Sequence, residues 1–419
     1  MMKFDVVIIG GGLSGLTCGI RLAQEGKKCV IISSGQSALH FSSGSFDLLN
    51  SLPDGTRVTN PLESLSDLSL LNPTHPYVKM GKERFAALAE ESKQLLEGVG
   101  IHTKGSYKKN HYRITPLAMV KSTWLTMMDF LSTDDPKTFN CKSFALFNFV
   151  GYLDFYPDYL SEKFERMGVK TQKFSIDLSS VERMRRNPSE LRSTNIARLF
   201  DEEEARKNLI RILEEKAADY EVVLLPACLG LENANVISEL SKAIGKPVYV
   251  VATFPPSVAG IRAQYLLKQK FMRLGGMYML GDTVNRVDMK ENSINKIFTV
   301  NHGDIPIVGD DYILCSGSFF SQGLVALPDK VIDPIFGLDI DYSPNRQDWY
   351  TANVYDKQRY LTFGVETNND FLAIKDKKIV RNLHACGAIL GGFDALKEGC
   401  GSGVSLLTAL YVAEEILRK

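Results

Sequence analysis

A strand–helix–strand pattern at the start of the chain limits its possible folds more than any other sequence feature. The apolar run Val6–Ile9 is typical of a strand buried on both faces of a parallel sheet. Apolar residues at helical spacing follow in Leu13–Gln24, and Cys29–Ile32 is a second apolar run. We therefore expect two parallel strands joined by a right-handed helical crossover.

Three glycines stand in GxGxxG register between the first predicted strand and the helix. Gly10 permits a tight turn, Gly12 lets the backbone approach a phosphate, and Gly15 allows the helix to pack closely on the strand. Amides at a helix N-terminus bind anions, so the pattern predicts a phosphate-bearing cofactor. A glycine-rich turn with nothing bound is the alternative. The expected contacts are Gly10, Gly11, Gly12, Leu13, Ser14 and Gly15.

The end of the second predicted strand lacks an acidic residue. Dinucleotide-binding folds place Asp or Glu there to accept a hydrogen bond from the adenosine ribose, but this chain has Ser33 and Ser34. Serine is a weaker partner for that ribose. The sequence therefore leaves two flavin cofactors open at this point, the dinucleotide FAD and the mononucleotide FMN.

Two further polar or glycine-rich segments predict contacts to the same cofactor. Hydroxyls and glycines are dense in residues 34–45, which suits a segment wrapping a ribityl phosphate, although a loop that solvates itself is equally compatible. A glycine cluster precedes the last apolar helix, whose first amides could stabilise negative charge on a reduced flavin. The expected contacts from these and from the strand ending at Cys315 are Ser33, Ser34, Ser43, Gly44, Ser45, Gly317, Gly392, Phe393, Gly401 and Ser402. No proton-abstracting base can be assigned.

The fold class expected from this order is α/β: a Rossmann-like FAD/NAD(P)-binding fold with a parallel sheet and a β-meander, plus an inserted α+β second domain. Residues 1–50, 255–330 and 380–419 are assigned to the discontinuous flavin-binding domain. Residues 51–254 and 331–379 are assigned to an inserted domain that covers substrate or meets a partner.

The composition limits the classes of partner and cofactor that this chain is expected to bind. Lys plus Arg and Asp plus Glu are 49 each, so no excess positive charge predicts binding to nucleic acid. The seven cysteines form no CxxC pair, and we expect neither a metal site nor an iron–sulfur cluster in this chain. No stretch approaches the roughly 18–20 apolar residues of a membrane span, so no direct transmembrane segment is expected.

Several strings resemble the B subunits of bacterial anaerobic glycerol-3-phosphate dehydrogenases, a flavoprotein family of the FAD/NAD(P)-binding Rossmann-like superfamily. They span nearly the whole chain in order: DVVIIGGGLSGLTCGIRLA, GQSALHFSSGSFDLL, LPACLGL, PPSVAGIR, LCSGSFFSQGLVA, GLD and GAILGGFDALKEGCGSGV. GQSALHFSSGS and PPSVAGIR are the most specific of these, because many dinucleotide-binding proteins share the glycine motif.

The resemblance implies a flavoprotein subunit that uses FMN and works beside a catalytic FAD subunit and a membrane-anchoring iron–sulfur subunit. Such a complex oxidises the polyol phosphate sn-glycerol 3-phosphate to dihydroxyacetone phosphate and relays electrons to a membrane quinone. The implied location is cytoplasmic, peripherally associated with the inner membrane through the partner subunits. Two alternatives stay open: a self-sufficient flavin dehydrogenase or oxidase acting on another small substrate, and a non-catalytic nucleotide-binding interaction protein.

Overall fold

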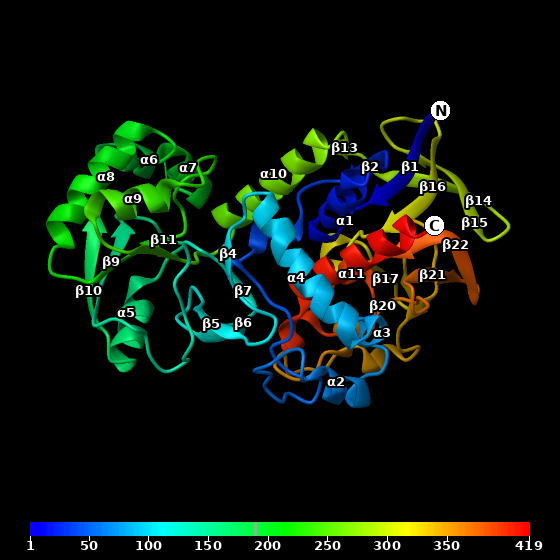
Figure 1. Cartoon of the computed structure of the whole chain (residues 1–419), viewed down its shortest axis with the longest axis horizontal. Helices are drawn as coiled ribbons and strands as arrows, with labels where there is room; N and C mark the ends of the chain where they lie inside the picture. The colour runs from blue at the N-terminus through cyan, green and yellow to red at the C-terminus, as the bar shows by residue number, and fades with distance from the viewer. Residues whose placement is uncertain (188–190) are drawn as a thin grey trace.

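The computed structural model describes residues 1–187 and 191–419. Figure 1 shows two lobes, with the first and last segments of the chain together in the larger lobe. An eight-stranded sheet lies at the centre of that lobe. Its strands are β1 (Met2–Ile9), β2 (Cys29–Ser33), β13 (Met277–Leu280), β14 (Val284–Lys290), β15 (Ser293–Thr299), β16 (Ile307–Leu314), β21 (Leu372–Lys375) and β22 (Lys378–Ala385).

The predicted crossover is confirmed by the pairing of β1. The strands follow the order β13-β2-β1-β16-β15-β14, and β22 pairs with both β16 and β21. Strand β1 is parallel to β2 on one side and to β16 on the other. Val7 and Ile8 in its centre are fully buried, which explains the unbroken apolar run. The expected meander is also present, because β14, β15 and β16 pair antiparallel in sequence order.

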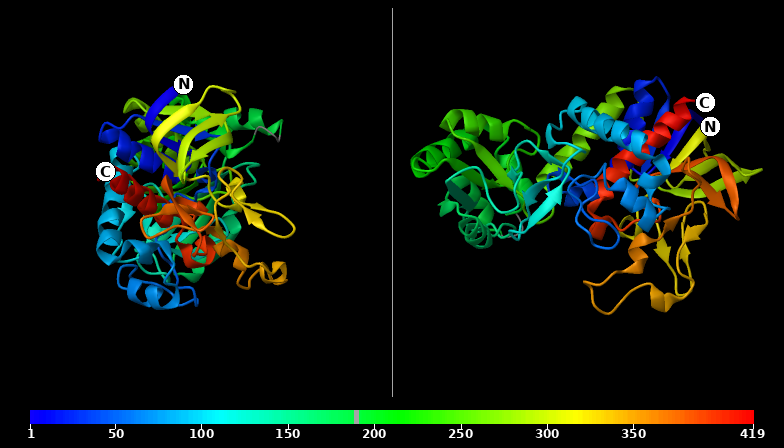
Figure 2. Two further views of the ribbon diagram at one scale, coloured as in Figure 1. Left: turned by 90° about the vertical axis from the view of Figure 1, so that its right-hand side faces the viewer. Right: turned by 60° about the horizontal axis from the view of Figure 1, so that its bottom comes forward.

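Helices from distant parts of the sequence pack together beside this sheet. Helix α1 (Leu13–Gln24) contacts both α10 (Val258–Arg273) and α11 (Gly401–Leu417), and α11 also contacts α4 (Lys82–Gly98). In the right-hand view of Figure 2 the first helix (blue) lies beside the last helix (red), in agreement with the contacts between α1 and α11. The N-terminal ends of α1 and α11 can therefore contribute to one site.

The smaller lobe is built around a second, four-stranded sheet in which every pairing is parallel. The strands, in the order β10-β9-β11-β12, are β9 (Ser143–Phe149), β10 (Lys170–Ile176), β11 (Val222–Pro226) and β12 (Val248–Val251). Its helices are α5 (Pro157–Arg166), α6 (Ser179–Arg185), α7 (Ser193–Leu199), α8 (Glu203–Lys216) and α9 (Val236–Ile244).

Two small antiparallel sheets and two short helices complete residues 45–133. One sheet joins β3 (Ser45–Phe46), β7 (Leu125–Met127) and β4 (Thr103–Gly105); the other joins β6 (Val120–Thr123), β5 (His111–Ile114) and β8 (Ser132–Thr133). The helices are α2 (Leu65–Leu71) and α3 (Pro76–Met80). The inserted segment thus combines parallel and antiparallel sheets, while the domain limits given above stay a prediction.

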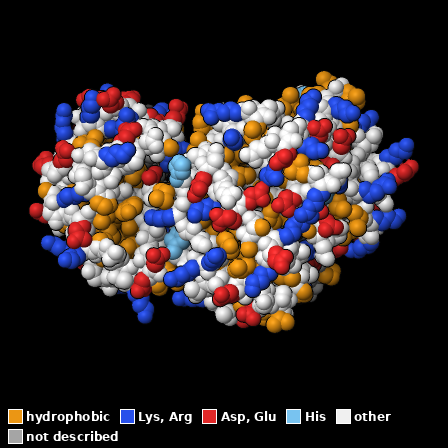
Figure 3. Space-filling view, in the orientation of Figure 1, with side chains coloured by type: hydrophobic (Ala, Val, Ile, Leu, Met, Phe, Trp, Pro, Cys, Tyr) orange, Lys and Arg blue, Asp and Glu red, His pale blue; other side chains and the backbone are white. Residues whose placement is uncertain are grey.

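The distribution of surface charge and the apolar character of the helices are both relevant to the partners of this chain. Figure 3 shows basic and acidic side chains interspersed over both lobes on the face drawn. Within residues 1–187 and 191–419, no helix combines the length and the apolar character that crossing a membrane requires.

Candidate functional site

The glycine motif that spans the turn after β1 and the first turn of α1 contains three glycines with different steric roles. Gly10 has a φ of +122°, and a Cβ there would lie 2.1 Å from the carbonyl oxygen of Cys315. A Cβ on Gly15 would lie 1.9 Å from the carbonyl oxygen of Gly10. A Cβ on Gly12 would meet only the Cβ of Ser37, at 3.7 Å. The chain itself therefore requires glycine at positions 10 and 15, whereas position 12 is sterically open.

The N-terminus of α1 is available to an anion. Gly12 is its N-cap residue and provides no side-chain hydrogen bond to the first turn, which also contains no acidic residue. Unpaired amides and the helix dipole therefore both favour a phosphate at this position.

A cavity of about 1410 Å³ opens at this helix end. It exceeds the roughly 300–1,000 Å³ of an ordinary small-molecule pocket, so it can accommodate a nucleotide cofactor together with a second small molecule. Most of the predicted cofactor contacts line it. They are Gly10, Gly11, Gly12, Leu13, Ser14, Ser33, Ser34, Ser43, Ser45, Gly317, Gly401 and Ser402.

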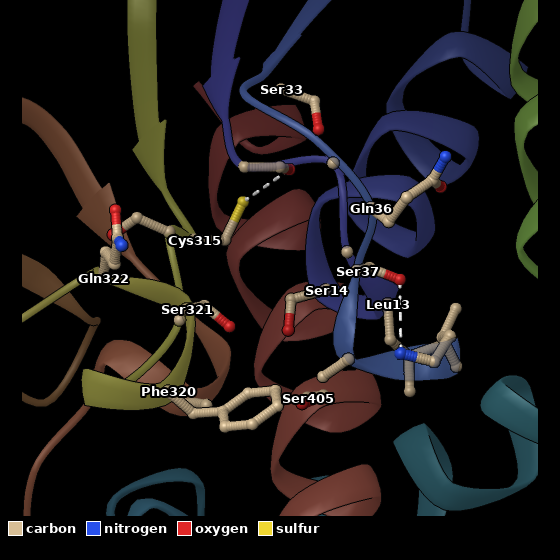
Figure 4. A pocket seen from close by; sticks show the side chains of 18 of the residues that line it. Leu13, Ser14, Ser33, Gln36, Ser37, Cys315, Phe320, Ser321, Gln322 and Ser405 are labelled. Atoms are coloured by element: carbon tan, nitrogen blue, oxygen red, sulfur yellow. Dashed lines mark hydrogen bonds between the residues drawn. The ribbon is translucent and has the colours of Figure 1, made fainter. Parts of the chain in front are cut away.

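Side chains from three separate parts of the sequence surround the cavity. Figure 4 shows Ser14 at the start of α1, Ser321 in the segment after β16, and Ser405 on α11 arranged around one space. The first turn of α11, like that of α1, contains no acidic residue. Two helix N-terminal ends therefore contribute to the lining.

Four predicted contacts lie outside the cavity lining: Gly15, Gly44, Gly392 and Phe393. Gly44 has a φ of +75°, and its missing Cβ makes room for the Phe130 ring, which such an atom would approach to 2.3 Å. The carbonyl of Gly392 accepts a hydrogen bond from the Asn72 amide at 2.6 Å, and Phe393 is buried in the core. These residues pack the structure around the cavity and do not face into it.

The end of β2 offers no carboxylate from its own residues. Ser33 donates its hydroxyl hydrogen bond to the Gly35 carbonyl at 3.0 Å. Asp282 also lines the cavity, but it contacts the Asn301 amide at 3.0 Å and the His302 ring at 2.8 Å. Burial raises the pKa of Asp282, but these bonds, led by that of the Asn301 amide, lower it overall. The Asp282 carboxylate therefore already accepts hydrogen bonds from the protein itself and has a structural role.

The serine-rich segment is held against α10. The His40 carbonyl accepts a hydrogen bond from the Ser257 amide at 2.8 Å, and a Cβ on Gly260 would lie 1.7 Å from the Leu39 carbonyl oxygen. His40 lines the cavity, and burial lowers the pKa of its ring. The close approach of α10 explains why Ser257 and Gly260 occur together in the PPSVAGIR string.

Asp47 and Arg113 also line the cavity, and the sequence analysis did not identify either. Asp47 immediately follows β3, and its amide donates to the Ser402 hydroxyl at 3.2 Å. Arg113 lies on β5. The position of Asp47 directly after the serine-rich segment was an available signal, whereas nothing local distinguishes Arg113 from the other basic residues around it.

A buried group of His75, Glu398 and Cys400 has the composition of a metal site, with its ligand atoms within 4.8 Å of one another. However, the Nδ1 of His75 accepts a hydrogen bond from the Tyr77 amide at 3.0 Å. Its Nε2 lies 3.2 Å from the Glu398 carboxylate, and both Nε2 and Oε2 of Glu398 are buried without a hydrogen-bond partner among the described residues. The hydrogen bond from Tyr77 occupies one of the two ring nitrogens, and no metal is assigned to this group.

The sequence of the chain matches known proteins over its whole length. Residues 5–404 match the family described as FAD binding domain. The chain is 45% identical over 417 residues to the B subunit of the anaerobic glycerol-3-phosphate dehydrogenase of Yersinia pestis bv. Antiqua (strain Antiqua), covering 99% of this chain and 98% of that protein. Identity to the protein of the same name is 43% over 418 residues in Pectobacterium carotovorum subsp. carotovorum (strain PC1), with coverage of 100% and 99%. It is 40% over 424 residues in Actinobacillus pleuropneumoniae serotype 5b (strain L20), with 99% of each chain covered. The family match runs from β1 to the start of α11 and includes both helix ends at the cavity.

Proposed function

The chain belongs to the family of anaerobic glycerol-3-phosphate dehydrogenase B subunits, and from this premise we propose that it is the flavin-dependent subunit of a complex oxidising sn-glycerol 3-phosphate to dihydroxyacetone phosphate. One observation carries the proposal. The cavity reaches from the open position at Gly12 to the start of α11, so a phosphate-anchored cofactor and a small substrate fit in one space.

The residues of the chain bind and orient the reactants in this proposal. The amides after Gly12 hold a cofactor phosphate, and the hydroxyls of Ser43 and Ser45, 3.2 Å apart, line the path toward α11. A bound flavin supplies two-electron redox chemistry. The buried walls of the cavity, which include Phe46 and Leu39, exclude water from the reacting groups.

FAD is the flavin that the observations favour, although the family resemblance implied FMN. The matched family is described as an FAD binding domain. The cavity also continues past the glycine turn along Ser33 and Ser34, where the adenosine half of a dinucleotide would lie. Backbone groups of Gly35 and Gln36 offer polar contacts there in place of the usual carboxylate.

The electron route leads outside this chain. We infer that it works beside a catalytic FAD subunit and an iron–sulfur subunit that holds the complex at the cytoplasmic side of the inner membrane, and that electrons reach a quinone there. The relatives are named as one lettered component of a dehydrogenase, which supports an assembly of several chains.

The cofactor is tested by releasing it from the purified full-length protein with acid and separating the supernatant by chromatography. We expect a yellow protein that releases FAD at close to one equivalent per chain. Release of FMN would instead identify the mononucleotide as the bound flavin. A colourless protein that retains no flavin on reconstitution would favour a non-catalytic nucleotide-binding role.

The role in the complex is tested by anaerobic mixing of the flavin-loaded protein with glycerol 3-phosphate, followed at the visible absorbance band of the oxidised flavin. Turnover with a quinone analogue at the full rate is expected only when the two partner subunits are added. If the isolated chain reached the rate of the complex, the electron-relay role would be wrong and a self-sufficient dehydrogenase would be favoured.

A further inference from the structure

We propose that Arg113 binds the phosphate group of the substrate at the end of the cavity where Asp47 lies. This inference rests on the proposed function, and it adds that this chain contacts the substrate itself. Arg113 lies on the short strand β5 and lines the cavity, yet its side chain is only 10% exposed. A cation so deeply buried beside an open space needs an explanation, because long basic side chains normally reach solvent.

The guanidinium of Arg113 makes no direct hydrogen bond within the part of the chain that the structure describes. Its Nε is buried without a partner. The nearest carboxylate oxygen, Oδ2 of Asp47, is 3.7 Å from Nη2, well beyond the roughly 2.7–2.9 Å of a charge-assisted hydrogen bond. Nε carries one of the five N–H donors of the guanidinium, whereas Nη1 and Nη2 carry the other four, are not among the fully buried unpaired atoms, and are the donors that an acceptor in the cavity can reach. The cavity is the place from which an acceptor can come.

The charge balance at this end of the cavity favours an anion. The Nζ of Lys121 also lies 3.7 Å from Oδ2 of Asp47, so two cations share one carboxylate. The immediate group of Arg113, Lys121 and Asp47 therefore has a net positive charge. A planar guanidinium matches the oxygen atoms of a phosphate in a bidentate arrangement, which a single carboxylate at 3.7 Å does not provide.

Asp47 adds a feature that suits a polyol phosphate rather than a bare phosphate ion. Its Oδ1 is buried without a hydrogen-bond donor among the residues that the structure describes. Its backbone is fixed to the start of α11, since its carbonyl accepts from the Gly403 amide at 2.9 Å and its amide donates to Ser402. Asp47 and Arg113 line the cavity side by side, so a substrate with a phosphate for the guanidinium and a hydroxyl for the carboxylate would contact both side chains.

The test compares Arg113→Gln with wild type by calorimetric titration of the flavin-loaded, full-length protein. The ligands are glycerol 3-phosphate, inorganic phosphate and uncharged glycerol. We expect the dissociation constant for glycerol 3-phosphate to rise about 10- to 100-fold, because a charge-assisted contact is lost. Binding of inorganic phosphate should weaken too, whereas glycerol should be unaffected. Arg113→Lys should recover part of the affinity, since lysine restores the positive charge but not the bidentate N–H groups of the guanidinium.

The control is Arg166→Gln on α5. The Arg166 side chain is 73% exposed and forms an ion pair with Glu162, one helical turn earlier. This variant should leave all three dissociation constants unchanged. If Arg113→Gln does not fold, Arg113→Met fills similar space without polar atoms and replaces it in the titration. Unchanged affinity for glycerol 3-phosphate in the neutral variant would overturn the inference.

Two other outcomes separate the sources of failure. Loss of flavin together with loss of substrate binding would also overturn the inference, because Arg113 would then bind a phosphate of the cofactor. If wild type bound flavin but neither glycerol 3-phosphate nor inorganic phosphate, the inference about Arg113 would be wrong while the flavin-dependent relay role would stand, whereas a wild type that bound no flavin would contradict the proposed function itself.

Discussion

Gly10 and Gly12 are two residues apart in one motif, yet the structure predicts opposite consequences for replacing them. Gly12→Ala places a methyl group where the only neighbour is 3.7 Å away, so the apoprotein should lose at most about 1 kcal/mol, since alanine is a poorer N-cap than glycine. The methyl group does face the phosphate position. We expect flavin affinity to fall at least about tenfold, measured by fluorescence titration of the apoprotein with FAD.

Gly10→Ala is the matched comparison. Its Cβ would meet a backbone oxygen at 2.1 Å in a backbone conformation with φ of +122°, so the fold should lose about 3 kcal/mol or more. Urea denaturation of the two apoproteins measures the difference. Full flavin retention in Gly12→Ala would show that no phosphate approaches this turn.

At the residue scale, the sequence predicted contacts that depend on the local backbone. The glycine turn and the serines at the end of β2 line the cavity because strand, turn and helix follow one another directly. Gly392 was expected there because its cluster is dense, but it lies outside the cavity lining, and its φ of +84° and the 3.1 Å that a Cβ would leave to the Thr74 carbonyl oxygen explain the glycine by the local backbone. Arg113 was missed because its position depends on the pairing of β5 with β6 and β8, which brings a distant strand to the cavity.

Among the elements, α10 acts on the cavity through its packing. Gly260 allows this helix to approach the Leu39 carbonyl in the turn Ala38–Phe41, part of which lines the site. Gly260→Ala should displace that turn, lower the stability by about 1–3 kcal/mol and weaken flavin binding without altering any lining residue. Thermal unfolding and FAD titration together measure both effects.

Gly98→Ala on α4 is the control for this change. Gly98 is also helical, but a Cβ there meets no atom within 4 Å. Alanine should leave flavin binding unchanged and stabilise the protein slightly, by up to about 1 kcal/mol. Equal behaviour of the two variants would contradict the packing role assigned to α10.

Some elements were predicted closely and others were missed, for a physical reason. Helix α1 has the expected limits, Leu13–Gln24. Strand β10 was not predicted. It is an edge strand with mostly exposed or half-exposed residues, and it is defined by pairing with β9 rather than by an apolar pattern.

On the scale of the whole molecule, the return of the chain to its first sheet was predictable, but the second sheet was not. The strand before the last glycine cluster, β22, pairs with β16 beside β1, and α11 packs on α1. Strand β22 and helix α11 thus repeat the strand-then-helix order of β1 and α1, and this order is visible in the sequence. The four-stranded sheet of the smaller lobe depends on pairings between segments whose composition alone did not indicate a parallel order.

Two buried histidines make the stability of the whole protein depend on pH. Burial, with a smaller effect of the Lys104 cation, lowers the pKa of His111 to about 4, and burial lowers that of His384 to about 3. Both rings are neutral in the fold at pH 7, whereas in the unfolded chain their pKa is about 6.5. The unfolded state therefore binds more protons below about pH 6.5. The contribution of the two rings to the free energy of unfolding is fully present above that pH and decreases as the pH falls toward about 4.

The contribution of His111 can be isolated. Each such group changes the free energy of unfolding by at most about 1.4 kcal/mol per pH unit, so lowering the pH from 7 to 5 should cost roughly 1–2 kcal/mol through His111. His111→Asn can still bond the Thr126 hydroxyl, which lies 2.7 Å from the ring, but it does not titrate. Urea denaturation at both pH values should show a smaller loss in this variant than in wild type. His102→Asn, which removes an exposed histidine, should keep the wild-type loss. An unchanged pH dependence in His111→Asn would mean that the ring gains its proton without unfolding, through water reaching the region of β5.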